Sequence, residues 1–200
     1  MSADACGAWS PGDCEGTPHC PVRCPRFVDR EGRPYLLLSL GDRTAEAAER
    51  AALAAMYEDF GEASRSMGLP PREDTAIREW LRNLAARGEH VLAWDDETVV
   101  GHAGFAPTEA AAPEFLVYVR GDYHGRGLGG ELTRQAIARA AAADHEALTL
   151  HVDGDNDPAI SLFRSLGFET VADHAMELQM RLPLSASVAE TVQLAPAARL

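Results

Sequence analysis

Residues 119–130 read VRGDYHGRGLGG and join a short apolar strand to the start of a helix. The glycines let the backbone turn sharply and come close to a ligand. The first N–H groups of a helix have no partners within it and lie at the positive end of its dipole. A phosphate or pyrophosphate is therefore the natural occupant of this turn, and Arg126 is a candidate charged contact. A glycine-rich turn that holds no ligand is the alternative.

Gly125, Gly127 and Gly130 also fit G-x-G-x-x-G, the fingerprint of dinucleotide-binding proteins. That fingerprint normally follows its strand directly and opens a repeated strand–helix–strand unit. Here residues 120–124 intervene, and only one strand, one helix and an antiparallel end follow the new helix. A dinucleotide-binding protein is therefore the less favoured alternative.

Two segments resemble the signatures of the GNAT superfamily of N-acetyltransferases. His124–Gly129 is similar to the family's Arg/Gln-x-x-Gly-x-Gly/Ala, with His in the first position. Asn156–Phe168 is similar to Asn-x-x-Ala-x-x-Leu-Tyr-x-x-Leu-Gly-Phe, with Phe163 at the tyrosine position. Two motifs in the right order are more specific than either alone, and the resemblance covers residues 34–182.

The resemblance implies an α/β fold with a mixed, strongly twisted sheet of about seven strands and helices on both faces. The fourth and fifth strands, after Pro113 and Glu146, should splay apart. The spacing of apolar residues and the turn residues predict the strands and helices independently of the resemblance. The expected strands are 34–40, 91–94, 99–105, 113–119, 148–152, 168–171 and 174–182. The expected helices begin at Asp42 or Thr44, at Asp74, at residues 125–130 and at Asn156.

The chain divides into three parts on composition. Residues 1–33 hold four cysteines and show no apolar period, which predicts an irregular leader. The resemblance implies an N-acetyltransferase domain over residues 34–182, and residues 183–200 are expected to be a loose tail. The spacing of Cys6, Cys14, Cys20 and Cys24 matches no common zinc pattern, so no metal is expected. A zinc-dependent interaction protein and a redox role for these thiols stay open.

The resemblance also implies where acetyl-CoA would bind. The backbone of the strand ending at Val119 would pair with the pantetheine arm, and the amides of residues 125–130 would hold the pyrophosphate. Asn156 would bond near the pantetheine or the acetyl end. The expected CoA-binding residues are Val117, Tyr118, Val119, His124, Gly125, Arg126, Gly127, Leu128, Gly129, Gly130, Asn156 and Phe163.

Transfer of an acetyl group from a thioester to an amine needs a base that removes a proton from the amine. The reaction tolerates the lack of an acid that would protonate the departing thiolate. Glu114 opens the strand beside the pantetheine and is the preferred base, with a solvated edge carboxylate as the alternative. His102 is the second candidate, although a lone His among apolar residues is often a hydrogen-bonded core residue. Phe163 has no hydroxyl, so the thiolate leaves unassisted, or Tyr118, Tyr123 or a water donates a proton.

Two further groups of polar residues are ambiguous. Tyr57, Glu58 and Asp59 follow the first helix, where they either line the acceptor cleft or form a solvated face. Residues 153–157 carry three aspartates that look like the start of a calcium loop, but the glycine and closing glutamate are missing. A turn with a helix N-cap is the favoured interpretation.

Composition and charge limit the partners. The 200 residues are 46% hydrophobic with a net charge of −13, and every basic residue is arginine. The negative electrostatic field of such a protein disfavours binding to nucleic acid and favours a cationic amine as the acceptor. No apolar run is long enough for a membrane span. The first residues lack a secretory pattern, so a cytoplasmic location is expected. We expect a monomer or a homodimer. The main functional alternative is a GNAT-fold module that binds CoA without turnover.

Overall fold

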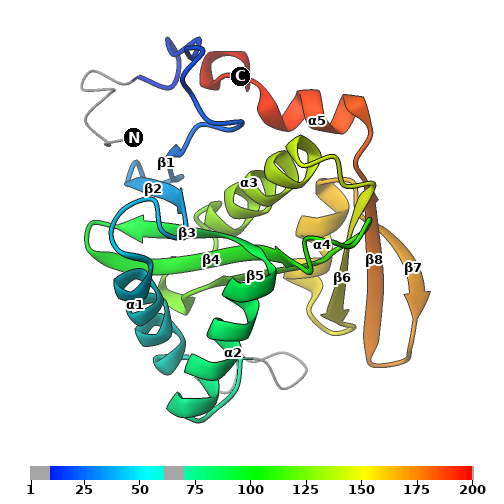
Figure 1. Cartoon of the computed structure of the whole chain (residues 1–200). Helices are drawn as coiled ribbons and strands as arrows, with labels where there is room; N and C mark the ends of the chain where they lie inside the picture. The colour runs from blue at the N-terminus through cyan, green and yellow to red at the C-terminus, as the bar shows by residue number, and fades with distance from the viewer. Residues whose placement is uncertain (1–9, 61–69, 200) are drawn as a thin grey trace.

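The fold is seen in a computed structural model that describes residues 10–60 and 70–199 (Figure 1). A single sheet of eight strands has the order β1-β2-β3-β4-β5-β6-β8-β7. The strands are β1 (Arg26–Val28), β2 (Pro34–Ser39), β3 (Glu89–Asp95), β4 (Thr98–Ala106), β5 (Glu114–Val119), β6 (Ala147–Asp153), β7 (Glu169–Asp173) and β8 (Glu177–Pro183). The helices are α1 (Glu46–Glu58), α2 (Asp74–Arg87), α3 (Leu128–Ala142), α4 (Asp157–Ser165) and α5 (Ala186–Gln193), with short 3₁₀ turns at Gly121–Tyr123 and Pro196–Arg199.

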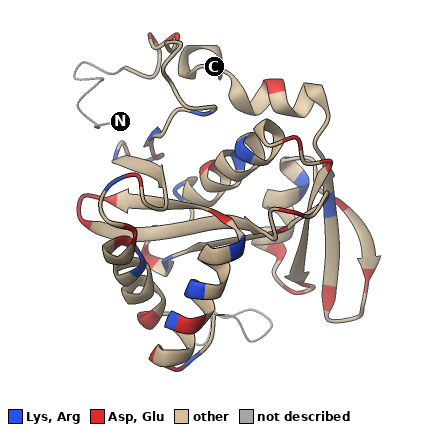
Figure 2. Ribbon diagram, in the orientation of Figure 1, with Lys and Arg blue, Asp and Glu red and all other residues tan. Residues whose placement is uncertain are grey.

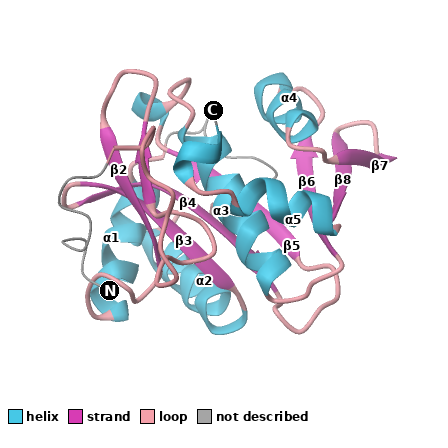
Figure 3. Ribbon diagram, turned by 90° about the horizontal axis from the view of Figure 1, so that it is seen from above, coloured by secondary structure: helices cyan, strands magenta, loops and turns pink. Residues whose placement is uncertain are grey.

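The mixed sheet carries helices on both faces, which confirms the expected fold class. α1 and α2 cover one face, and α3 and α5 lie across the other (Figures 1 and 3). Each face has its own apolar core. Leu132 and Ile137 of α3 and Phe163 of α4 lie in the larger core, while Leu53 of α1 and Ile77 of α2 lie in the smaller one. The acetyltransferase-like motifs therefore sit on one continuous, twisted scaffold.

The strand pairings are antiparallel except at one place. β5 and β6 run parallel and share a single registered pair, Glu114 with Thr149. The expected splay between the fourth and fifth strands of the predicted sheet is confirmed, and these strands are β5 and β6 because β1 adds one strand at the edge.

The start of α1 differs from the expected one. Its N-cap residue is Ala45, and neither Asp42 nor Thr44 takes that role. The buried carboxylate of Glu49, one turn inside the helix, accepts the backbone N–H groups of Arg43 at 2.8 Å and Thr44 at 2.6 Å. Glu49 thus anchors the chain that enters α1 but accepts no N–H group of the first helical turn, so α1 has no side-chain N-cap and begins later than its sequence indicates.

Two segments contain more structure than the sequence indicates, although the division into leader, domain and tail stays a prediction. Residues 26–28, inside the expected irregular leader, form β1 and pair with β2. Residues 186–193, inside the expected loose tail, form α5, which packs on α3. Val192 of α5 is buried in the larger core, and burial of this apolar side chain explains why the segment is helical.

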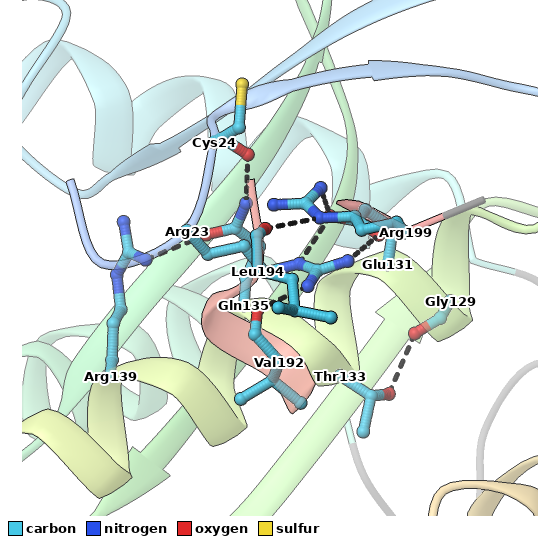
Figure 4. Close-up of polar contacts among 10 residues, drawn as sticks. All are labelled: Arg23, Cys24, Gly129, Glu131, Thr133, Gln135, Arg139, Val192, Leu194 and Arg199. Atoms are coloured by element: carbon cyan, nitrogen blue, oxygen red, sulfur yellow. Dashed lines mark hydrogen bonds and ion pairs between the residues drawn. The ribbon is translucent and has the colours of Figure 1, made fainter. Parts of the chain in front are cut away.

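A buried ion pair fastens the N-terminal segment to α3 (Figure 4). The guanidinium of Arg23 donates to both carboxylate oxygens of Glu131, at 2.7 and 2.6 Å, and also to the carbonyl of Val192 in α5. Only 3% and 7% of these two side chains are exposed. Gln135 adds a hydrogen bond of 2.7 Å to the carbonyl of Cys24. Both ends of the described chain therefore meet on one face of α3.

Charged residues are interspersed over the described elements (Figure 2). In the described part of the chain, we find no helix whose length and apolar character would let it cross a membrane.

We expect the Arg23–Glu131 pair to dominate the stability of this face. Arg23→Met leaves the buried Glu131 carboxylate with Arg199 at 3.9 Å as its remaining ion-pair partner, so the free energy of unfolding should fall by about 3–5 kcal/mol. The double variant Arg23→Met/Glu131→Leu should recover most of that loss, because it removes both buried charges and leaves only the partly exposed Arg199 without its partner. Urea unfolding measures both. Equal destabilisation by the single and double variants would contradict this account.

Candidate functional site

The divergence of β5 from β6 opens a cleft of about 1430 Å³. At its closed end, the backbone N–H of Thr149 donates to the carbonyl of Pro113 at 3.0 Å. Beyond that point the two strands separate towards Val119 and Asp153. The β5 edge on this side is therefore left without a neighbouring strand, and its backbone groups face the cleft instead of a ladder. An extended ligand could pair with that edge.

The glycine turn closes the wide end of the cleft. Gly125 and Gly127 have φ angles of +76° and +97°, which disfavour residues other than glycine. A Cβ atom at Gly125 would meet nothing within 4 Å, so the backbone there is open to a ligand. α3 starts at Leu128, whose side chain is buried, so this residue offers the cleft its backbone only. The turn joins β5 to α3 as the sequence predicts.

Two side chains of the turn are engaged elsewhere. His124 lines the cleft and forms a hydrogen bond of 2.8 Å with the carbonyl of Val119. Arg126 does not line the cleft: its guanidinium donates to the carbonyl of Asp122 and pairs with Glu31 at 3.1 Å. The charged contact expected from Arg126 is therefore directed away from the cleft.

Arg30 lines the same end of the cleft and was missed by the sequence analysis. It lies in the turn between β1 and β2, where its guanidinium donates to the carbonyl of Gly125 at 3.1 Å. The backbone N–H of Arg30 donates to the carbonyl of Arg126 at 3.2 Å. The sequence of the leader segment predicts irregular structure and gives no sign that Arg30 lies beside the glycine turn. The pairing of β1 with β2 brings it there.

α4 supplies the far wall of the cleft. Asn156 lines it and is the N-cap of α4, accepting a hydrogen bond of 3.2 Å from the N–H of Ala159. Phe163 also lines the cleft, but most of its surface is buried against Phe115 and Phe168. Phe163 is thus mainly a core residue, although the sequence analysis places it among the expected CoA-binding residues.

Glu114 lies at the closed end, where β5 and β6 are bridged. Its carboxylate is 3.0 Å from Nδ1 of His151 on β6, and Nε2 of His151 is 3.6 Å from Glu177 on β8. Both Glu114 and His151 line the cleft. The sequence analysis missed His151, although the alternation of β6 gives a signal: Leu148, Leu150 and Val152 are buried in the core, which puts His151 on the opposite face.

Tyr118 lies on the same face, among aromatic rings. The ring centroids of Tyr57, Phe60 and Trp80 are 5.6–6.3 Å from its own. Burial, together with the negative charges of Asp153 and Glu114, raises the pKa of Tyr118 to about 12. Its hydroxyl therefore stays protonated at neutral pH. The hydroxyl of Tyr123, by contrast, already donates to Asp95 at 2.8 Å, which favours Tyr118 as a proton donor.

The remaining polar candidates are structural. His102 is completely buried between Tyr57, at 2.6 Å, and His90, at 2.9 Å. Burial lowers the pKa of His102 well below its ordinary value, and the neighbouring His90 lowers it further. Tyr57 is itself fully buried and does not line the cleft. His102 is therefore a neutral core residue and is not placed to act as a base.

The acidic candidates beside the cleft are used in ion pairs and turns. Glu58 pairs with Arg78 at 2.8 Å and Asp59 with Arg120 at 3.4 Å, and neither lines the cleft. The backbone N–H of Asn156 donates to the carbonyl of Asp153, which makes residues 153–157 a turn and helix start.

The cysteines form no metal cluster in the part of the chain that the structure describes. Cys14, Cys20 and Cys24 are free thiols, and Cys6 lies outside the described residues. Over residues 10–60 and 70–199, no group of three or more His, Cys, Asp or Glu side chains is placed to hold a metal ion.

Comparison with known proteins finds acetyltransferases among the relatives of this chain. The model of the acetyltransferase (GNAT) family matches residues 53–168. An L-methionine sulfoximine/L-methionine sulfone acetyltransferase of Pseudomonas aeruginosa is 31% identical over 140 residues, covering 66% of this chain and 81% of that protein. A mycothiol acetyltransferase of Corynebacterium aurimucosum is 33% identical over 89 residues. That match covers 44% of this chain but only 26% of the longer relative.

Solved structures share the fold. The yncA protein of Salmonella typhimurium, solved with its cofactor acetyl-CoA, has a TM-score of 0.61 at 20% identity. The similarity covers 74% of this chain and 94% of that one.

The environment of Tyr118 predicts an unusual titration. Because the folded state holds this proton more tightly than the unfolded chain does, the free energy of unfolding should fall between about pH 10 and pH 12. Tyr118→Phe should remove part of that fall. It should also leave the tyrosinate absorbance of the folded protein unchanged at about pH 10. Loss of about half a tyrosinate equivalent at that pH, the amount that a phenol with an ordinary pKa near 10 contributes, would contradict the assigned environment.

Proposed function

The chain belongs to the acetyltransferase (GNAT) family and is an N-acetyltransferase, and on that premise we propose that it transfers the acetyl group of acetyl-CoA directly to a primary amine. One observation carries the proposal: the cleft between β5 and β6 widens towards the glycine turn at the start of α3. A long ligand with a phosphate at one end and a thioester at the other matches that shape.

The donor site would use backbone groups more than side chains. The free edge of β5 at Val117–Val119 would pair with the amide groups of the pantetheine arm. The amides of residues 125–130 would hold the pyrophosphate. The open space at Gly125, and the ordinary contacts of 3.6 and 3.7 Å that a Cβ at Gly129 would make, support a backbone cradle that is not filled by protein atoms.

The acceptor would enter from the face that carries Glu114, Tyr118 and His151. A lysine-like amine, whose ordinary pKa is near 10.4, is protonated at neutral pH, and removing its proton costs about 4.6 kcal/mol; an α-amino group has a lower ordinary pKa, so removing its proton costs less. Glu114 would take this proton, and His151 at 3.0 Å would orient the carboxylate. N–H groups of β5 near Val117 would stabilise the negative charge that develops on the carbonyl oxygen.

Departure of the thiolate requires less assistance than attack of the amine. Phe163 occupies the position where a tyrosine could donate a proton, so Tyr118, which stays protonated and lines the cleft, would replace it. The same phenylalanine supports a second candidate function, a module that binds CoA without efficient turnover.

The name of one relative supports a proposal for the acceptor class. The Pseudomonas aeruginosa relative acts, by its name, on L-methionine sulfoximine and L-methionine sulfone. We propose a small α-amino acid of this kind as the first acceptor to test.

Thiol release from acetyl-CoA tests the activity. The panel would contain L-methionine sulfone, an amino sugar, a diamine and a peptide with a free N-terminus. Acceptor-dependent thiol release with any member supports the proposal. Binding of acetyl-CoA without release across the panel would favour the non-catalytic module.

Glu114→Gln separates chemistry from binding. At neutral pH it should lower kcat with L-methionine sulfone by about 10²–10⁴-fold, because the ammonium group of the acceptor loses its proton acceptor. KM for acetyl-CoA should change little, and the loss of kcat should shrink as pH rises and free amine accumulates. Steady-state thiol release at several pH values measures these effects.

Gly129→Val is the matched variant for the other end of the cleft. Its Cβ fits beside Leu162 and Val119, so the protein should fold, while KM for acetyl-CoA should rise first. An unchanged kcat in Glu114→Gln would remove the base assignment, and an unchanged KM in Gly129→Val would remove the backbone cradle.

A further inference from the structure

The glycine turn presents no arginine or lysine of its own to the cleft. Arg126 is turned towards Glu31 and Asp122, and the first position of the motif holds His124, which bonds to the carbonyl of Val119. The chain has no lysine and a net charge of −13. A ligand that carries several phosphate charges would therefore meet an acidic protein whose backbone turn lacks a cationic partner.

Arg30 fills this gap from outside the segment that matches the family model, residues 53–168. Among the described residues that line the cleft, the arginines are Arg30 at the glycine turn and Arg87 on α2. The Arg30 side chain is exposed, and the hydrogen bond from its guanidinium to the carbonyl of Gly125 uses one N–H group. Since a guanidinium carries five N–H donors, the others can reach a phosphate oxygen in the cleft.

The turn that carries Arg30 is held rigidly. Within it, the carboxylate of Asp29 accepts the N–H groups of Glu31 and Arg33 at 2.9 Å each and the hydroxyl of Tyr35 at 2.9 Å. Phe27 of β1 lies against the glycine turn, 3.5 Å from where a Cβ at Gly127 would stand.

The turn is also tied to the molecule around it. Across the interface, Arg126 reaches back to Glu31. Arg33 pairs with Asp95 at the end of β3, which fastens the far side of the turn to the sheet. Residues 26–35 are thus placed before any ligand arrives, which lowers the entropic cost of using Arg30.

We propose that the β1–β2 hairpin is part of the CoA site and that Arg30 binds a phosphate group of CoA beside the glycine turn. This inference rests on the proposed use of acetyl-CoA. It gives the N-terminal segment a binding role, whereas its composition alone indicates an irregular leader.

Equilibrium binding of acetyl-CoA tests the assignment without needing an acceptor. Arg30→Gln should weaken binding roughly ten- to a hundredfold, because a charge-assisted hydrogen bond to phosphate is lost. Arg30→Lys should recover part of the affinity. Arg50→Gln is the matched control, since Arg50 pairs with Glu46 on the outer surface of α1 and does not line the cleft. Thermal unfolding of each variant checks that it is folded.

Two further readouts separate phosphate binding from simple support of the turn. Between about 0.05 M and about 0.5 M sodium chloride, affinity should fall less steeply for Arg30→Gln than for the wild type, because one ionic contact is absent. With 3′-dephospho-CoA, a persisting effect of the substitution assigns Arg30 to the pyrophosphate, and a vanishing effect assigns it to the 3′-phosphate.

Each outcome decides the proposal. Equal affinity of Arg30→Gln and Arg50→Gln, or weaker binding with an unchanged salt dependence, would overturn it. Failure of the wild type to bind acetyl-CoA would overturn both this inference and the proposed function. Binding that depends on Arg30, without acetyl transfer to any acceptor, would overturn the catalytic proposal alone.

Discussion

The parting of β5 and β6 after one bridged pair is the constraint on which the rest of the site depends. A sheet interior normally satisfies every backbone N–H and carbonyl by pairing with a neighbouring strand. Here the sheet gives up that pairing between Glu114 and Val119, and the edge it exposes lies inside the molecule. The flanking antiparallel pairs, β4 with β5 and β6 with β8, keep each half of the sheet intact on either side of the gap.

The two ends of the chain reinforce the wall beside this gap. α3 starts at the wide end of the cleft and is buried along most of its length, including polar residues such as Glu131 and Gln135. Arg23 of the N-terminal segment donates to Glu131, the carbonyl of Cys24 accepts a hydrogen bond from Gln135, and α5 packs on α3. The position of the glycine turn is therefore set by contacts on both sides of α3: the sheet below it and the terminal segments above it.

Local patterns predicted the fold well where the signal lies within a few residues. The glycine turn and the Asn156 N-cap appear as expected. The strand expected over 174–182 forms as β8 over Glu177–Pro183, so it begins three residues later, and Met176 is exposed before it. The sequence failed where a charged residue is used at long range. Arg23 reads as a solvated base in a proline-rich segment, yet its partner is Glu131, 108 positions away. Glu49 likewise reads as an ordinary helix-surface acid, yet it is buried and binds the backbone before its own helix. At the candidate site, Arg30 and His151 were missed because their neighbours come from distant strands.

The central claim is that the gap between β5 and β6 binds a ligand mainly through backbone groups. Backbone hydrogen exchange with and without acetyl-CoA tests this claim most directly. The account predicts that exchange slows at residues 116–119 and 125–130 when acetyl-CoA is added, while the amides of α1 are unchanged. Saturating acetyl-CoA that slows exchange elsewhere and leaves both segments unaffected would contradict it.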